Sequence, residues 1–232
     1  MPSKRYKKNA KLVEDLKSVP LKEAVALLAK FEKAKFNETV DLALRLGVDP
    51  KQSDQMVRGT VPLPHGSGKN VRVLVFAKPG ASAEAARQAG AEFVGFDDMI
   101  KKCSDGWVDF DVAVATPEAM VEVRKLGKVL GPRGLMPNPK TGTVTDDTAK
   151  AVKEVKAGRV EFKVDKTGNV HVPVGKLAFP PEQIEENARA VIEAVAKARP
   201  ASVKGIYLQS CTLSGTMSPG VRVDTREFVA TT

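Results

Sequence analysis

The sequence has few cysteines, few aromatic residues and no long apolar run. Its two cysteines, Cys103 and Cys211, lie far apart and outside any CxxC pair. Cysteine-based metal sites need close ligand spacing, so we expect no metal site and interpret both thiols as reduced and structural. No apolar stretch of signal-peptide length follows the charged N-terminus, which favours a cytoplasmic protein without a membrane span.

Groups for catalysis and cofactor binding are also scarce. His65 and His171 have neither a cysteine nor a second histidine nearby, so no metal site or histidine-based triad is indicated. Residues 65–70 (HGSGKN) look like a phosphate-binding loop, but Leu63 and Asn70 stand where that motif needs Gly and Ser or Thr. The segment also precedes a strand instead of following one. We therefore expect no catalytic residue and no cofactor.

What the chain does have is positive charge and enough apolar residues for an ordinary core. Lys and Arg total 37 against 28 Asp and Glu, which gives a net charge of +9. This balance suits a polyanionic partner, although charge alone does not identify it. With 42% hydrophobic residues in 232 positions, the chain is long enough for two domains of about 100 residues each.

Both ends of the chain carry amphipathic elements. Residues 20–35 have apolar positions at helical spacing, and Val40 to Leu46 alternate apolar and polar residues as in a strand with one wet face. Residues 159–165 and 169–175 are predicted to form a hairpin, residues 181–198 a helix, and residues 203–213 and 220–228 two strands. The first 66 residues are too few to bury a core alone.

The middle of the chain has a different pattern. Short, nearly all-apolar runs at residues 71–77, 92–96 and 110–115 alternate with helix-like stretches, which predicts a β-α-β-α-β-α order with a parallel sheet. We predict two domains. Residues 1–66 plus 159–232 form an α+β domain, and residues 67–158 form an inserted, Rossmann-like three-layer α/β domain.

Two surfaces are candidates for binding. Residues 125–144 (KLGKVLGPRGLMPNPKTGTV) combine four basic residues with four glycines and three prolines, which predicts an irregular loop suited to phosphates; a solvated loop is an equal alternative. Lys35, Phe36 and Thr39 with the small residues 214–220 form a second candidate, able to approach an RNA backbone. Composition alone favours burial of Phe36 and Met217 in the core instead.

Three segments carry a resemblance to a known family. They are AKFNETVDLALRLGVDPKQSDQMVRGTVPLPHGSGK at 34–69, KLGKVLGPRGLMPNPKTGTV at 125–144 and TMSPG at 216–220. In this order they resemble the ribosomal protein L1 family, over nearly the full chain and most closely its bacterial members. The resemblance implies a structural component of the large ribosomal subunit, not an enzyme, that binds 23S rRNA at a mobile stalk. It also implies contact with exit-site tRNA during its release, and repression of the protein's own operon mRNA.

The resemblance also assigns roles to individual residues. It implies rRNA contacts for Lys35, Phe36, Thr39, Lys166, Thr167, His171, Ser210, Thr216, Met217 and Ser218, with Lys166, Thr167 and His171 resting on a less specific motif. The basic segment supplies a candidate contact for tRNA or a second RNA through Lys125, Lys128, Arg133 and Lys140. Ser218 stands where the family usually has glycine, so it either leaves a slightly larger gap to RNA or adds a hydroxyl contact.

Two rival functions stay open on sequence grounds. One is a nucleotide-binding enzyme, because parallel α/β sheets often bind cofactors at the carboxyl ends of their strands. The other is a general nucleic-acid-binding protein outside the ribosome, which would show no preference for rRNA over random duplex at moderate salt.

Overall fold

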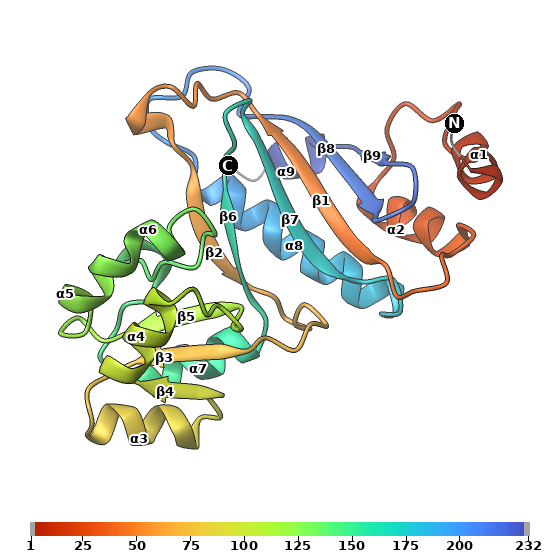
Figure 1. The fold of residues 1–232 in the computed structure, drawn as a ribbon. Helices are drawn as coiled ribbons and strands as arrows, with labels where there is room; N and C mark the ends of the chain where they lie inside the picture. Colours follow the sequence, from red (N-terminus) through yellow and green to blue (C-terminus); the bar gives the residue numbers. More distant parts are fainter. Residues whose placement is uncertain (1–2, 230–232) are drawn as a thin grey trace. The chain divides into compact units, whose positions relative to one another are not determined.

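The computed structural model describes residues 3–229, apart from the side chains of Ser53, Lys140 and Val229. Residue contacts group them into two compact units of mixed helix and sheet (Figure 1). The first unit contains the described residues up to Gly68 and those from Val160 onward, and the second is Lys69–Arg159. Independent folding of each unit stays a prediction. No helix of the described chain has the length and apolar character needed to cross a membrane.

The first unit is built on a four-stranded antiparallel sheet in the order β7-β1-β8-β9. The strands are β1 (Thr39–Leu46), β7 (Asn169–Lys176), β8 (Leu208–Gly215) and β9 (Val221–Val223). The predicted alternation in β1 is confirmed, because Val40, Leu42, Leu44 and Leu46 are all buried. Each such side chain contributes about 1.5–3 kcal/mol of burial free energy, which fixes the face that β1 turns to the core.

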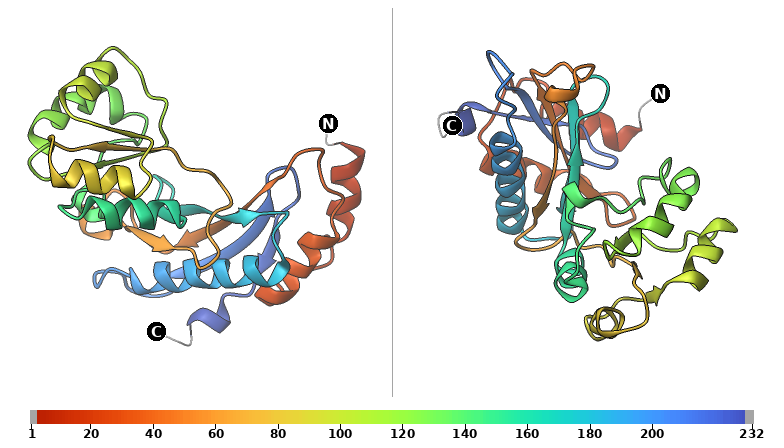
Figure 2. Two further views of the ribbon diagram at one scale, coloured as in Figure 1. Left: turned by 90° about the horizontal axis from the view of Figure 1, so that it is seen from below. Right: turned by 90° about the vertical axis from the view of Figure 1, so that its left-hand side faces the viewer.

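Helices cover the core face of this sheet (Figure 2). They include α2 (Leu21–Lys30) and α8 (Pro181–Lys197), while α9 (Arg226–Val229) follows β9. Helix α8 agrees with the predicted element, and its Ile184, Ala188, Val191, Ile192 and Val195 are buried as the periodicity indicated.

The predicted helix at 20–35 ends earlier, at Lys30. Phe31 has extended backbone angles (φ −66°, ψ 145°). The side chain of Asn9 then holds the next residue, accepting from the backbone N–H of Glu32 at 3.0 Å and donating to its carbonyl at 3.2 Å. Asn9 lies on α1 (Lys4–Lys11), a helix that the sequence did not reveal because it has almost no apolar face.

The hairpin predicted at residues 159–175 forms only at its turn. Strand β6 (Arg159–Lys163) pairs with β2 (Arg58–Pro62) in a separate two-stranded sheet, while β7 joins the large sheet. A single bridge between Val164 and Val170 links the two arms. The pairing of β6 with β2 uses a close approach: a Cβ on Gly59 of β2 would lie 2.7 Å from the ring of Phe162, so glycine there lets β2 approach β6 closely.

The second unit has a parallel three-stranded sheet, as the apolar runs predicted, in the order β4-β3-β5. Its strands are β3 (Val73–Phe76), β4 (Phe93–Gly95) and β5 (Val112–Ala115). Alternate residues of β3 enter opposite cores: Val73 and Val75 pack with α3 (Ala81–Gln88) and α7 (Thr148–Lys156), and Leu74 and Phe76 pack on the other face. That other face is covered by α4 (Asp97–Ser104), α5 (Met120–Val123) and α6 (Gly127–Leu130).

The prediction that residues 125–144 form no regular structure is wrong for its first six residues. A 3-10 turn, η2 (Arg124–Leu126), continues from α5 into α6, and a second, η3 (Pro139–Thr141), lies further along. Leu126 and Leu130 are buried at 3% and 0% exposure. Glycine costs about 1 kcal/mol in a helix, which burial of two leucines more than offsets.

Candidate nucleic-acid interface

The face of the large sheet opposite α2 and α8 carries small polar side chains. Register pairs Asp41 with Ser214, Ala43 with His171 and Thr212, and Arg45 with Ser210. Paired residues in a sheet point to the same side, so these side chains share one face with Thr39. We call this the open face and define it by its residues: Thr39, Asp41, Ala43, Arg45, His171, Ser210, Thr212 and Ser214. All of them are exposed or half-buried.

The sheet brings the distant segments of the second candidate surface together at one end of the open face. Thr39 begins β1, and the turn after β8 holds Thr216, 177 positions away. The Thr39 N–H donates to Thr216 Oγ1 at 3.1 Å, and the Thr216 N–H donates to the Thr39 carbonyl at 3.0 Å. We call this the Thr39 end; Lys35, Phe36, Thr39, Thr216, Met217 and Ser218 belong to it.

Phe36 and Met217 project from this end instead of closing the core. They are 54% and 52% exposed, so the composition-based expectation of burial is wrong for both. Their exposure at one end of the sheet makes this end a candidate surface for a partner. The Lys176 ammonium donates to Thr39 Oγ1 at 2.7 Å, which leaves the hydroxyl proton of Thr39 to donate outward.

The hydroxyl of Ser218 is turned into its own loop. Ser218 Oγ accepts from the Gly215 N–H at 2.8 Å and donates to the Gly215 carbonyl at 3.3 Å. Ser218 is half-buried, and no described non-glycine residue has a positive φ, so its backbone does not require glycine. Of the two sequence-based alternatives, a direct hydroxyl contact with RNA is therefore disfavoured.

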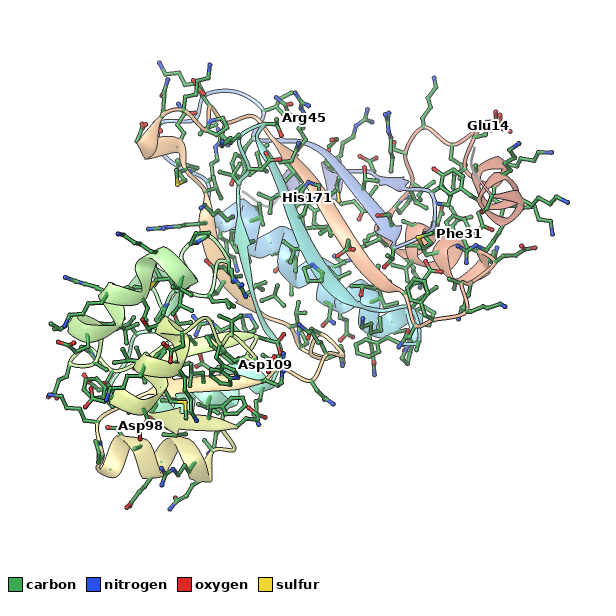
Figure 3. All side chains as sticks on the ribbon, viewed as in Figure 1. Glu14, Phe31, Arg45, Asp98, Asp109 and His171 are labelled. Carbon is green, nitrogen blue, oxygen red and sulfur yellow. The ribbon has the colours of Figure 1, made fainter. Side chains whose placement is uncertain are left out.

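The remaining predicted rRNA residues lie elsewhere on the same sheet. Figure 3 shows Arg45 at the far end of β1 and His171 between the two ends. Ser210 pairs with Arg45, so it also lies at the far end. Arg45 is six positions along the strand from Thr39, roughly 20 Å at about 3.4 Å per residue. The predicted set is thus spread along a face and does not form one cluster.

The polar groups of Thr167 stabilise the turn in which this residue lies. Its N–H and its hydroxyl both donate to Asp165 at 2.8 Å, and the N–H of Asn169 donates to the same carboxylate at 2.8 Å. The Asn169 N–H is the main cause that lowers the pKa of Asp165 to about 2. Lys166 is exposed at the tip of this ordered turn.

One acidic residue stands on the open face among these groups. Burial raises the pKa of Asp41, and the nearby charges of His171 and Lys176 partly oppose the rise. A carboxylate here repels phosphates, so the open face is suited to sugar and base edges more than to a dense row of phosphates.

Glu38 was not among the site residues predicted from the sequence, although the alternation of apolar and polar residues in β1 indicates that its side chain is buried. Glu38 is two residues before Val40 and therefore has the parity of the buried positions, and its exposure is 2%. Its carboxylate accepts from the backbone N–H of Ala34 at 2.7 Å and of Met217 at 2.9 Å.

The basic segment of the second unit is partly neutralised. Lys125 forms an ion pair with Glu122 at 2.6 Å, whereas Lys128 and Arg133 are exposed and have no ion-pair partner in the described part of the chain. The side chain of Lys140 lies outside the described residues. Among the described basic side chains of this segment, Lys128 and Arg133 offer a free charge for phosphate. Lys128 lies in helix α6, and Arg133 lies in the irregular part that follows.

The hollow at the carboxyl ends of β3 and β4 is where a nucleotide would bind in a protein of this sheet type. Its volume is about 390 Å³, and Glu84, Asp97 and Asp98 line it beside a single arginine, Arg87. Three carboxylates disfavour a phosphate group at this edge. Residues 65–70 are also engaged: Asn187 accepts from the His65 N–H at 3.1 Å and donates to the Gly66 carbonyl at 3.0 Å.

An open face with apolar residues exposed at one end, on a chain of net charge +9, is suited to binding a folded RNA. The chain belongs to the ribosomal protein L1p/L10e family, whose model matches residues 28–219. It is accordingly a large-subunit ribosomal protein that binds rRNA, in a family of structural proteins and not of enzymes. The match contains every residue to which an RNA contact was assigned.

Proposed function

We propose that the protein binds 23S rRNA at the mobile stalk of the large subunit, with the Thr39 end as its specific contact. The observation that carries this placement is the exposure of Phe36 and Met217 on an otherwise polar face. Phe36 stacks on a base or sugar, Met217 fills a neighbouring gap, and Thr39 donates to a ribose hydroxyl. The Thr216 hydroxyl accepts from the Thr39 N–H and donates to the Thr39 carbonyl at 3.3 Å, so Thr216 holds Thr39 in place and accepts from RNA with its remaining lone pair. Lys35 adds a positive charge at the Thr39 end. His171 and Ser210 extend the contact along the open face, and Lys166 and Thr167 extend it to the turn before β7.

Two terms then determine the affinity. Lysines supply attraction to phosphates, which weakens as salt rises, while the Thr39 end supplies contacts that depend on the folded shape of the RNA. The experiment is a filter-binding titration of the protein on a 23S rRNA stalk fragment and on a random duplex of equal length, at three salt concentrations. Equal affinity for both RNAs refutes the proposal and favours a general nucleic-acid-binding protein.

We infer that the second unit contacts tRNA at the exit site through Lys128 and Arg133, with Lys125 and Lys140 as neighbours. The support is their position on one continuous segment and the free charge of the first two. Paired Lys128→Ala and Arg133→Ala substitutions leave rRNA-fragment binding unchanged and slow tRNA release from ribosomes. Unchanged release refutes this role.

Repression of the protein's own operon mRNA follows if that mRNA presents the same RNA shape as the stalk. One surface then binds both RNAs, so they compete. A competition titration in which the mRNA leader displaces the rRNA fragment from the wild-type protein tests this, and simultaneous binding of both RNAs contradicts it.

A further inference from the structure

Glu38 is a carboxylate buried at the Thr39 end, where it joins three segments. Its two oxygens accept hydrogen bonds from the backbone of Ala34 and of Met217, and the Leu177 N–H donates to its carbonyl at 2.9 Å. A guanidinium nitrogen of Arg5 lies 3.8 Å from the carboxylate. At 2% exposure, Glu38 does not itself present an atom to a partner.

Both exposed apolar residues depend on these bonds. The N–H of Met217 donates directly to one carboxylate oxygen of Glu38. The other oxygen accepts from the N–H of Ala34, and Phe36 follows Ala34 by two residues. The intervening residues 34–37 form neither helix nor strand, so local hydrogen bonding has to fix their path. The carboxylate therefore sets where Phe36 and Met217 emerge relative to each other.

Burying a carboxylate costs free energy, and two short charge-assisted bonds offset that cost only while both donors stay in place. This makes the arrangement stiff. A surface already fixed in its binding geometry loses less conformational entropy when RNA docks, which raises affinity without adding a contact.

We propose that Glu38 is a positioning residue for rRNA recognition, which prepares the Thr39 end for a folded RNA without touching it. This inference rests on the proposed function. It predicts an effect opposite in sign to that expected from charge. Removing a negative charge beside an RNA site strengthens binding electrostatically, whereas removing a positioning residue weakens it.

The test is Glu38→Gln. A glutamine amide has one acceptor oxygen, so it keeps one backbone N–H bond and turns an NH₂ group toward the other. We expect the affinity for the rRNA stalk fragment to fall by up to about tenfold to a hundredfold, because the free energy of one hydrogen bond to a charged group limits how far the binding geometry can lose its population. The slope of log affinity against log salt stays the same, and so does binding to random duplex.

The matched control is Glu32→Gln. Glu32 is on the same segment and is half exposed, and its carboxylate pairs with Lys8 at 2.8 Å without bonding to residues 34 or 217. This variant removes the same charge and leaves the fragment affinity equal to or tighter than wild type. An equal or tighter complex with Glu38→Gln as well overturns the positioning role.

A second measurement uses the wild-type protein, so it stands even where Glu38→Gln folds poorly. Hydrogen exchange of the Ala34 and Met217 amides, followed by NMR, is slowed by the two bonds. Exchange at the rate of unprotected amides overturns the proposal.

Phe36→Ala and Met217→Ala, measured in parallel, separate this inference from its premise. If they weaken fragment binding and Glu38→Gln does not, only the role of Glu38 is lost. If none of the three has an effect, the rRNA contact lies elsewhere and both proposals fail.

Discussion

Replacing Phe36 with alanine tests the placement of the rRNA contact most directly. The ring is 54% exposed in the free protein, so truncation removes little core packing. A phenylalanine side chain buries about 200 Å², and the exposed half, roughly 110 Å², is available to RNA at about 25 cal/mol per Å², which gives ~3 kcal/mol. Base stacking on an aromatic ring contributes a similar ~1–3 kcal/mol.

Phe36→Ala should therefore weaken binding to the stalk fragment by about 5-fold to 150-fold. Its unfolding free energy should change by less than about 1 kcal/mol, because truncating an exposed side chain leaves the backbone bonds to Glu38 in place. The salt slope should not change, since no charge is lost.

Filter binding at three salt concentrations and a urea titration measure these quantities. Val121→Ala is the control, an apolar residue 66% exposed on the second unit. An unchanged fragment affinity for Phe36→Ala refutes the assignment, and so does a loss that Val121→Ala reproduces.

Further substitutions address the remaining parts of the scheme. Thr216→Val should weaken specific fragment binding with little change in salt slope, whereas Lys35→Ala should also make the slope shallower by about one unit, since one phosphate contact is lost. Ser218→Gly should weaken binding about fivefold, because the turn loses the 2.8 Å bond from the Gly215 N–H; a tighter complex would show that close approach by glycine matters more. Asp111 has a pKa lowered to about 2 from 3.8, chiefly by the Lys69 hydrogen bond, so its carboxylate stabilises the protein above pH 3.8 and this contribution disappears as the pH falls through 2. Asp111→Asn should therefore cost about 1 kcal/mol of unfolding free energy near neutral pH and almost nothing at pH 2, as urea titrations across that range would measure. A variant without residues 69–159, with the cut ends rejoined by a short linker, should fold and keep its fragment affinity; a folded variant that ignores the fragment contradicts the assignment of the contact to the first unit.

The sequence predicted the elements whose apolar period is regular. Helix α8 and strand β1 bury the residues that periodicity selected, and the apolar runs predicted the parallel strands, of which β3 and β5 are largely buried and β4 is half-buried. Helix α1 was not predicted from the sequence, because polar groups stabilise it. Ser3 caps its first turn, and the buried Asn9 forms hydrogen bonds with Glu32. Such tertiary hydrogen bonds leave no period in the sequence.

The candidate site was only partly accessible to the same reasoning. A residue list does not show that Phe36 and Met217 are exposed, because large apolar side chains are usually buried. Nor does it show that Ser218 bonds to Gly215 or that Ser210 lies a strand's length from Thr216, since register decides both. The alternation of β1 indicates that Glu38 has the parity of the buried positions. Its hydrogen-bond partners, Ala34 and Met217, come together only in the folded sheet.

The central place of β1 in its sheet has a consequence for the timing of synthesis. Its two neighbours are β7 and β8, and Thr39 bonds to Thr216, 177 residues later. At about 5–20 residues per second, a ribosome needs roughly 9–35 s to make that stretch. A growing or prematurely ended polypeptide thus has no completed Thr39 end. Only a chain that has been translated past β8 can bind RNA through this surface.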